Sequence, residues 1–331
     1  MHFALVCSTT TEESGGMAKP VQNGPFLLDP DSDNVLLKQN LNLEKIEKNL
    51  YRSTYQEVNL GGRNIFGGQL IGLGVMAAGD TIESGYHLHS LHCYFLKGGL
   101  DQPILYQVEA TREGSTYCSR SVKAIQNGLT LFTMQCSFKK PETDSFEHQF
   151  KMPDVPKPDE LKNTSQLVQD WIDDTNPSNE NYCGILRMYK KILDRATYEV
   201  RPVYPQRYRH QTSLEPRECV WIRAKQPLGD DPHLNKCVAA YYSDMHISIV
   251  SSYPKPRTSN PVILPFLTSS LDHSMWFHHP FRIDDWLLYE VESPHTANGR
   301  GFGVGRFWTQ DGKLVMSVAQ EGMIRTLKAK L

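Results

Sequence analysis

The chain has 331 residues, of which 39% are hydrophobic and 22% are charged, and its formal net charge is −2. This composition is typical of a soluble globular protein with room for two domains of ordinary size. The near-neutral charge argues against nucleic acid or an anionic membrane as a main partner, and no run approaches the roughly 18 apolar residues of a membrane-spanning helix.

The cysteines and histidines bear on redox compartment and metal binding. The seven cysteines are odd in number and scattered, and no two form a Cys-x-x-Cys pair. This pattern favours reduced, mostly buried thiols in an intracellular compartment over a disulfide framework. On a strand, His87 and His89 would share a face while His92 would point the other way, so we expect no metal site there.

The first third of the chain predicts a tail, two helical segments and the start of a sheet. Residues 1–40 are expected to form a disordered or extended tail. Residues 43–50 show a polar helical pattern, and an extended run follows them. Residues 66–82 are apolar almost all round and lack proline, which is typical of a buried helix. The five glycines of this segment lower its helix propensity, but they would let a sheet approach closely.

Strand and turn signals follow. Residues 104–109 alternate with period 2, which predicts a strand. Asn127-Gly128 and Asp311-Gly312 each separate two apolar stretches and predict hairpins, since a type I′ turn needs positive φ at both central residues. Residues 139–158 hold four prolines among charges and predict a linker, and residues 164–195 have helical character. A strand at 217–225 and a helix from about Pro232 come next.

The second half of the chain repeats the first. Ile-Leu-Tyr-Gln-Val-Glu at residues 104–109 returns 183 positions later as Leu-Leu-Tyr-Glu-Val-Glu at 287–292. Gln-Asn-Gly at 126–128 returns 184 positions later as Gln-Asp-Gly at 310–312. Agreement in order and spacing at two separated places indicates a duplicated unit. Each copy is predicted to be one long buried helix followed by an antiparallel sheet.

The two copies differ in their polar residues. Gln320 takes the place of Cys136 at the end of an apolar strand, where a buried amide needs partners. On a helical wheel, Asp244 falls on the flank of the apolar stripe, and from the helix alone a solvated carboxylate is the simpler interpretation. Asp272 and His273 are neighbours on a predicted strand, so they would face opposite ways and make a poor catalytic dyad.

Two familiar catalytic patterns do not apply. The sequence contains no Gly-x-Ser-x-Gly elbow, which argues against an α/β-hydrolase. The three alternate glycines of residues 301–305 superficially resemble a nucleotide loop, but they lie inside a predicted strand. These glycines are better explained by the close approach of a helix or a ligand to one face of the sheet.

Several motifs resemble those of the type II acyl-CoA thioesterases. In the first copy they are Phe66-Gly67-Gly68-Gln69 and Ala124-Ile125-Gln126-Asn127-Gly128. In the second copy they are Tyr242-Ser243-Asp244, the run from Leu271 to His278, Trp286-Leu287-Leu288-Tyr289, Gly301-Phe302, Thr309-Gln310-Asp311-Gly312 and Gln320-Glu321-Gly322. The resemblance covers about residues 45–331 in order, more loosely over 150–230. It implies an α+β double hot-dog fold, in which two tandem units, each a long helix wrapped by an antiparallel sheet, form a pseudo-dimer.

The repeat and the resemblance set the expected domains, and the last three residues set the expected location. We expect an N-terminal hot-dog at 41–140, a linker with a helical segment at 141–195, a C-terminal hot-dog with the catalytic residues at 196–327 and a targeting tail at 328–331. Ala329-Lys330-Leu331 is a close variant of the Ser-Lys-Leu peroxisomal address. It predicts the peroxisomal matrix as the location and the import receptor as a partner. We also expect a homo-oligomer.

The activity that the resemblance implies is hydrolysis of fatty acyl-CoA thioesters to free fatty acid and coenzyme A, a step of lipid metabolism. Matched by position, the family's catalytic Asp, Thr-or-Ser and Gln fall on Asp244, Ser270 and Gln320. Asp244 would activate water as general base, and Ser270 and Gln320 would orient that water. Gly68, at the head of the first long helix, is a candidate oxyanion donor. Coenzyme A belongs to the substrate, so no cofactor and no metal are expected.

Two other functions stay open. One is a hot-dog enoyl-CoA hydratase, which would place a catalytic Asp and His a few residues apart at the helix entrance. The other is a catalytically inactive module that binds acyl-CoA. The retained Asp244, Ser270 and Gln320 favour the thioesterase over both.

Overall fold

The structure is a computed structural model that describes residues 40–58, 64–143, 145–176, 179–209, 213–254 and 266–326. The predicted tail at 1–40 lies almost wholly outside these ranges. The predicted address Ala329-Lys330-Leu331 also lies outside them.

The first half of the chain forms one helix and six strands. These are β1 (Leu43–Glu47), β2 (Leu50–Ser53), α1 (Gly67–Gly79), β3 (His87–Phe95), β4 (Leu105–Arg112), β5 (Tyr117–Gln126) and β6 (Leu129–Lys139). Four helical segments and one strand come next: η2 (Pro158–Glu160), α2 (Thr164–Asp174), α3 (Glu180–Arg195), β7 (Tyr198–Pro202) and η3 (Pro205–Arg209). The rest comprises β8 (Arg217–Ala224), α4 (Pro232–Ser243), α5 (Ile247–Val250), β9 (Phe266–Ser270), β10 (Asp272–Phe277), β11 (Leu287–Ala297), β12 (Arg300–Thr309) and β13 (Leu314–Thr326).

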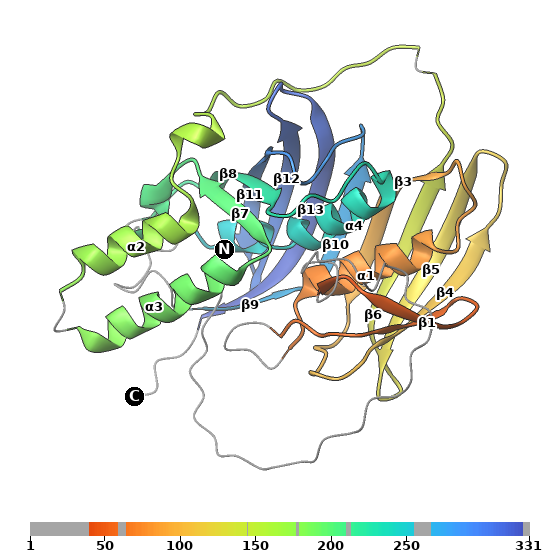
Figure 1. The fold of residues 1–331 in the computed structure, drawn as a ribbon, viewed down its shortest axis with the longest axis horizontal. Helices are drawn as coiled ribbons and strands as arrows, with labels where there is room; N and C mark the ends of the chain where they lie inside the picture. The colour runs from red at the N-terminus through yellow and green to blue at the C-terminus, as the bar shows by residue number, and fades with distance from the viewer. Residues whose placement is uncertain are drawn as a thin grey trace.

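The strands form one antiparallel sheet whose order shows the duplication. Strands β3 and β10 pair at its centre, with Cys93 opposite His273. Outward from this pair, the order is β6-β5-β4-β2-β1 on one side and β13-β12-β11-β8-β7 on the other. Each strand on this path therefore has a counterpart in the other copy. Strand β9 lies off the path, pairs with β13 and has no counterpart among the described strands of the first copy. Residues 105–109 and 287–292 belong to the counterparts β4 and β11, which confirms the repeat, and Ile104 lies directly before β4 (Figure 1).

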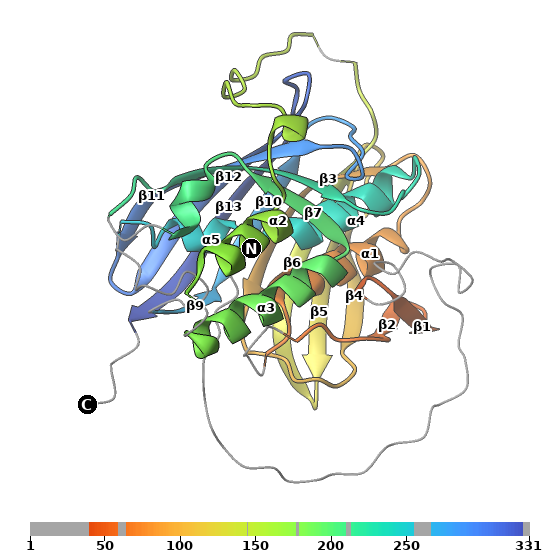
Figure 2. The ribbon, with the colours of Figure 1, turned by 60° about the vertical axis from the view of Figure 1, so that its left-hand side comes forward.

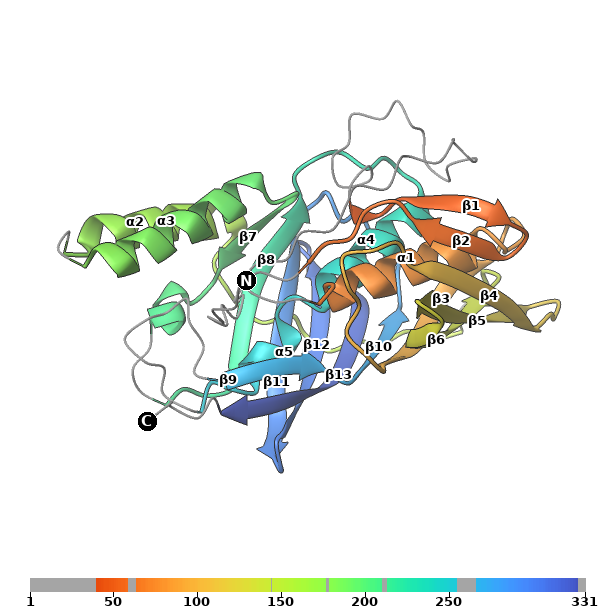
Figure 3. The ribbon, with the colours of Figure 1, turned by 90° about the horizontal axis from the view of Figure 1, so that it is seen from below.

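Helices α1 and α4 lie side by side within the curve of the sheet (Figures 1 and 3). They run antiparallel: a Cβ at Gly68 would collide with the Tyr241 carbonyl, and one at Gly79 would collide with the His233 ring. All residues of α1 from Gly68 to Ala78 are buried, as its all-round apolar sequence predicts. The glycines at this contact admit the partner helix, whereas a sheet was expected there. This arrangement is the double hot-dog architecture.

The predicted helix at residues 43–50 is wrong. The segment forms strands β1 and β2, which turn at Asn49 with φ of 63°. Leu43 and Tyr51 are fully buried, and β2 continues the sheet by pairing with β4. Pairing with a strand more than 50 residues away therefore outweighs the weak local preference for a helix.

The two predicted hairpins form, but with different turns. Asn127 and Gly128 join β5 to β6 with φ of 50° and 75°, as a type I′ turn requires. At the turn from β12 to β13, only Gly312 has positive φ, so the type I′ prediction for Asp311-Gly312 is wrong. Asn298 and Gly299, which join β11 to β12, both have positive φ, and this turn was not predicted.

The predicted linker packs against the outer face of the sheet in the second copy. The indole of Trp221 donates a 2.9 Å hydrogen bond to the Pro156 carbonyl, and the Gln149 amide donates one of 2.7 Å to the Gly312 carbonyl. Met152 and Val155 cover the buried tryptophans beneath them. Helices α2 and α3 confirm the helical segment and lie together beside β7 (Figure 2).

The predicted orientation of the histidines on β3 is wrong. The pairing of β3 with β6 shifts register between Leu88 and Ser90, and this bulge turns His89 and His92 to the same face. His89 contacts Ser137 Oγ at 2.7 Å, and His92 contacts Ser274 Oγ at 3.0 Å. Within the described ranges, no group of three His, Cys, Asp or Glu residues is placed to hold a metal ion. Nor is any helix in those ranges long and apolar enough to cross a membrane.

Candidate functional site

The candidate site lies where the C-terminus of α4 meets the N-terminus of α1. Asp244 is the C-cap residue of α4 and is only 7% exposed. The apolar Phe66 at the N-cap of α1 offers no acceptor to the first amides of that helix. Asp244 supplies one from the other copy, because its carboxylate accepts a hydrogen bond from the Gly68 amide. A carboxylate is also favoured at this position by the positive end of the α1 dipole.

Ser270 and Gln320 reach Asp244 from the sheet. Ser270 ends β9, which pairs with β13 so that Ser270 lies opposite Gly322. Ser270 Oγ donates a 2.9 Å hydrogen bond to Asp244 Oδ1, and Gln320 Nε2 donates one of 2.9 Å to Ser270 Oγ. The structure therefore brings together the three side chains that the sequence singled out.

The environment of Asp244 makes its carboxylate a stronger base than usual. Burial raises the pKa of Asp244 from 3.8 to about 6, while hydrogen bonds from Gln320, Ser270 and the Gly68 amide oppose that rise. The carboxylate is thus ionised at neutral pH yet binds a proton more readily than a solvated one. The interpretation of Asp244 as a solvated side chain is wrong, because the end of α4 that carries Asp244 packs against the start of α1 from the first copy.

His273 extends this cluster and was not among the predicted site residues. Its ring is fully buried, with Nδ1 hydrogen-bonded to Gln320 Oε1 and Nε2 2.8 Å from Ser243 Oγ. Its neighbour Asp272 faces the other way and accepts the Glu321 amide at 2.7 Å. The sequence did hold a signal for His273. Gln320 replaces the Cys136 of the first copy, and a buried side-chain amide needs a polar partner on the neighbouring strand.

A second carboxylate, partly buried and also not predicted, lies beside the same helix ends. Glu57 accepts hydrogen bonds from the Tyr241 hydroxyl and, at 2.9 Å, from the Asn40 amide. Burial raises the pKa of Glu57, and the bonds from Tyr241 and Asn40 oppose that rise. The Glu57 backbone amide donates to Gln69 Oε1 at 2.7 Å, which ties this loop to α1. These contacts hold the first turn of α1 in place.

The Gly68 amide is already engaged by Asp244. A hydrogen bond to Asp244 and one to a substrate oxyanion would compete for the same proton. The Gly68 amide stays a predicted oxyanion donor, one that would have to share its proton with Asp244.

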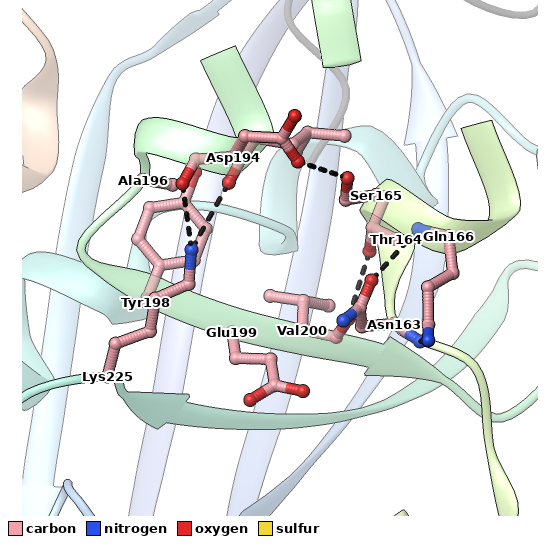
Figure 4. A pocket seen from close by; sticks show the side chains of 11 residues that line it. Asn163, Thr164, Ser165, Gln166, Asp194, Ala196, Tyr198, Glu199, Val200 and Lys225 are labelled. Carbon is pink, nitrogen blue, oxygen red and sulfur yellow. Dashed lines mark hydrogen bonds between the residues drawn. The ribbon is translucent and has the colours of Figure 1, made fainter. Parts of the chain in front are cut away.

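A cavity of about 200 Å³ lies elsewhere, between the start of α2, the end of α3 and β7 (Figure 4). Its charged groups are already paired. Lys225 Nζ donates to the carbonyls of Leu193 and Asp194 at 3.3 Å, and Ser165 hydrogen-bonds to the Asp194 carboxylate. The cavity walls include none of Asp244, Ser270 and Gln320. Its geometry supports no reaction at that place.

Both halves of the chain match models of one protein family. The model described as "Acyl-CoA thioesterase N-terminal domain" matches residues 56–139, and the one described as "Acyl-CoA thioesterase" matches residues 190–323.

Curated relatives agree with these matches. The chain is 39% identical to human "Acyl-coenzyme A thioesterase 8" over 90% of this chain and 92% of the relative. It is 34% identical to "Acyl-CoA thioesterase 2" of Haemophilus influenzae over 86% of this chain and 95% of the relative. It is 24% identical to "Peroxisomal acyl-coenzyme A thioester hydrolase 1" of Saccharomyces cerevisiae over 82% and 90%.

Solved structures support the same fold. The acyl-CoA thioesterase II TesB2 from Mycobacterium marinum superimposes with a TM-score of 0.67 at 32% identity, covering 86% of this chain and 96% of that one. A protein with a hot dog fold from Alicyclobacillus acidocaldarius superimposes with a TM-score of 0.63 at 17% identity, covering 86% and 96%. The second likeness bears on the fold alone.

Proposed function

Because this chain belongs to the type II acyl-CoA thioesterases and hydrolyses acyl-CoA thioesters, we propose that Asp244 is the general base of that hydrolysis. The Asp244 carboxylate would take a proton from a water molecule as that water attacks the thioester carbonyl. Ser270 and Gln320 would orient the water and Asp244 through their hydrogen bonds. General-base assistance of this kind typically contributes ~10²–10⁴-fold to a rate.

One observation carries this proposal: a buried carboxylate with a pKa raised to about 6 accepts a hydrogen bond from Ser270, which in turn accepts one from Gln320. A base is most effective when its pKa lies near the working pH, and this carboxylate lies closer than a solvated Asp would. A thioester carbonyl is already electrophilic, so we propose that the reaction needs neither a metal ion nor a cofactor. Coenzyme A enters as part of the substrate.

Purified protein incubated with palmitoyl-CoA and a thiol reagent tests the proposal. We expect wild-type protein to release free thiol and Asp244→Asn to release it at least ~10²-fold more slowly. Full activity in Asp244→Asn would exclude Asp244 as the base. A change in enoyl-CoA absorbance without thiol release would instead indicate a hydratase, and binding of acyl-CoA without either signal would indicate an inactive module.

We further propose that the protein works in the peroxisomal matrix on fatty acyl-CoA. Two observations support this location: the terminal tripeptide Ala329-Lys330-Leu331 resembles a peroxisomal address, and the yeast relative is named as peroxisomal. The peroxisomal import receptor would then be a partner. Deleting the tripeptide should leave activity intact and send a tagged protein to the cytosol. Peroxisomal import of the truncated protein in cells without full-length subunits would contradict the proposal.

We also propose that the protein forms a homo-oligomer. The outer face of the sheet at the β3–β10 pair carries two large exposed aromatic side chains, Tyr94 at 60% and Trp276 at 38% exposure. Large exposed apolar groups grouped on one face are typical of protein–protein contacts. Sedimentation analysis should give a mass above the 37.7 kDa of one chain, and Tyr94→Ser with Trp276→Ser should reduce it.

A further inference from the structure

We propose that His273 is a positioning residue for the hydrolytic site, which fixes the Gln320 carboxamide so that its NH₂ group faces Ser270. This inference rests on the proposed function of Asp244. It adds one residue to the predicted trio and gives it a task that is distinct from contact with substrate.

The direction of each hydrogen bond follows from the charge on Asp244. An ionised carboxylate can only accept, so the Ser270 hydroxyl must donate its single proton to Asp244 Oδ1. Ser270 Oγ can then only accept from Gln320, which therefore presents its NH₂ group. The carbonyl end of the Gln320 carboxamide is left facing the His273 ring.

The His273 ring satisfies that carbonyl only in one tautomer. Gln320 Oε1 needs a donor, so His273 Nδ1 must carry the proton. Burial lowers the pKa of His273 to about 4, so the ring is neutral and Nε2 carries no proton. Nε2 is then an acceptor 2.8 Å from Ser243 Oγ, where it shares the single hydroxyl proton with the Ala240 carbonyl, also 2.8 Å away. The hydrogen bonds thus run in one direction from His273 through Gln320 and Ser270 to Asp244.

In the first copy, apolar residues occupy the positions that correspond to His273 and Gln320. Leu91 pairs with Cys136 across β3 and β6. Ser274 pairs with Ala319, which puts His273 opposite Gln320 one residue further on. A buried apolar pair in one copy therefore corresponds to a buried polar pair in the other. Burying two polar side chains is costly unless they bond to each other, so His273 and Gln320 are explained together rather than singly.

Without the N–H donor of His273, the Gln320 carboxamide could flip and exchange the positions of its oxygen and its NH₂ group. With its oxygen toward Ser270, Gln320 would accept the Ser270 proton and take it away from Asp244. The water and Asp244 would then lose the orientation that Ser270 provides. The substrate-binding surfaces would stay unchanged, so we expect kcat to fall while KM changes little.

A double-mutant cycle on the full-length protein tests this role. We expect His273→Leu, which installs the residue of the first copy, to lower kcat for palmitoyl-CoA by ~10–10²-fold and to change KM by less than about twofold. In a Gln320→Ala background the same substitution should change kcat by less than about twofold, because its target is gone. His273→Asn retains an N–H near the position of Nδ1 and should recover most of kcat. Leu91→Ala is the matched control for core damage, with kcat unchanged.

Equal losses of kcat from His273→Leu in both backgrounds would overturn the proposal, because a merely structural residue acts regardless of Gln320. The proposed function has its own test, since Asp244→Asn can be inactive while this cycle fails. Nitrogen-15 spectra of histidine-labelled wild-type protein decide the matter even if His273→Leu does not fold. We expect the Nδ1–H tautomer for His273, and an Nε2–H tautomer would contradict the proposed direction.

Discussion

The carboxylate of Asp244 lies so close to Gly67 that a Cβ on Gly67 would sit 2.6 Å from Asp244 Oδ2. The two residues come from different copies of the duplicated unit. Gly67 opens helix α1, and Asp244 ends helix α4. The absence of a side chain at residue 67 is therefore a condition for Asp244 to reach the first amides of α1.

Gly67→Ala should consequently displace the Asp244 carboxylate. We expect kcat/KM to fall by at least ~10-fold, since small misplacements of a catalytic group are costly. Gly74→Ala is the matched control on the same helix, because its Cβ would come close to the flexible end of Met134, at 2.7 Å, and would make an ordinary contact with the Phe132 ring at 3.5 Å. Thiol-release kinetics of the two variants check this prediction. Equal effects would show that the helix contact as a whole matters, and not the space beside Asp244.

Asp244→Asn should lower activity strongly and raise stability at alkaline pH. The folded-state pKa of about 6 lies above the ordinary 3.8, so the folded state holds the proton more tightly. The stability from this group is full below pH ~4 and is lost as pH rises through about 6, about 3 kcal/mol in all. Asn cannot ionise, so the Tm of the variant relative to wild type should rise between pH 4 and pH 7 and then level off.

Asp272→Asn is the control for that experiment, because the Asp272 carboxylate bonds to the Glu321 amide and points away from Asp244. It should retain thiol release. The catalytic carboxylate would be wrongly assigned if Asp272→Asn abolished thiol release while Asp244→Asn did not.

The pH profile should report the ionisation of Asp244. We expect kcat/KM to rise with pH through about 6, as the carboxylate loses its proton and can act as a base. Ser270→Ala removes a hydrogen bond that lowers the Asp244 pKa, so its acidic limb should move to higher pH. A limb that stayed in place or moved to lower pH would contradict the assigned contact.

Ser270→Ala and Gln320→Ala should combine non-additively. Gln320 and Ser270 both hydrogen-bond to Asp244, and Gln320 also donates to Ser270. The three side chains therefore act as one unit, and the second substitution removes little once the first is made. We expect the double variant to lose about as much kcat as the worse single variant. Fully additive losses, measured in the same thiol assay, would mean that the two side chains act independently.

The sequence predicts those parts of the fold that local patterns determine. Helix α1 is apolar on all sides, and Asn127-Gly128 carries its own turn geometry, so both could be recognised without their partners. Strand β1 could not be recognised in this way, because it pairs with β2, and β2 joins the sheet by pairing with β4, more than 50 residues further along the chain. The bulge near His89 is likewise a property of the pairing between β3 and β6.

The site was predictable only in part, for the same reason. The resemblance to a family pointed to Asp244, Ser270 and Gln320, and the structure places them together. Periodicity alone gave the wrong environment for Asp244, because Asp244 packs against the start of α1 at Gly67, which lies 244 − 67 = 177 residues earlier in the chain. His273 was assigned no role in the site because its partner Gln320 lies 47 residues further along.

The pairing of β3 with β10 joins the two copies into one sheet within one polypeptide. Two separate chains that shared such a contact would part on dilution, and Asp244 would then lose the Gly68 amide. Here the two groups are tethered, so their effective concentration is set by the fold and not by the amount of enzyme. This intramolecular contact should therefore persist at nanomolar enzyme, whatever larger assembly the chain enters.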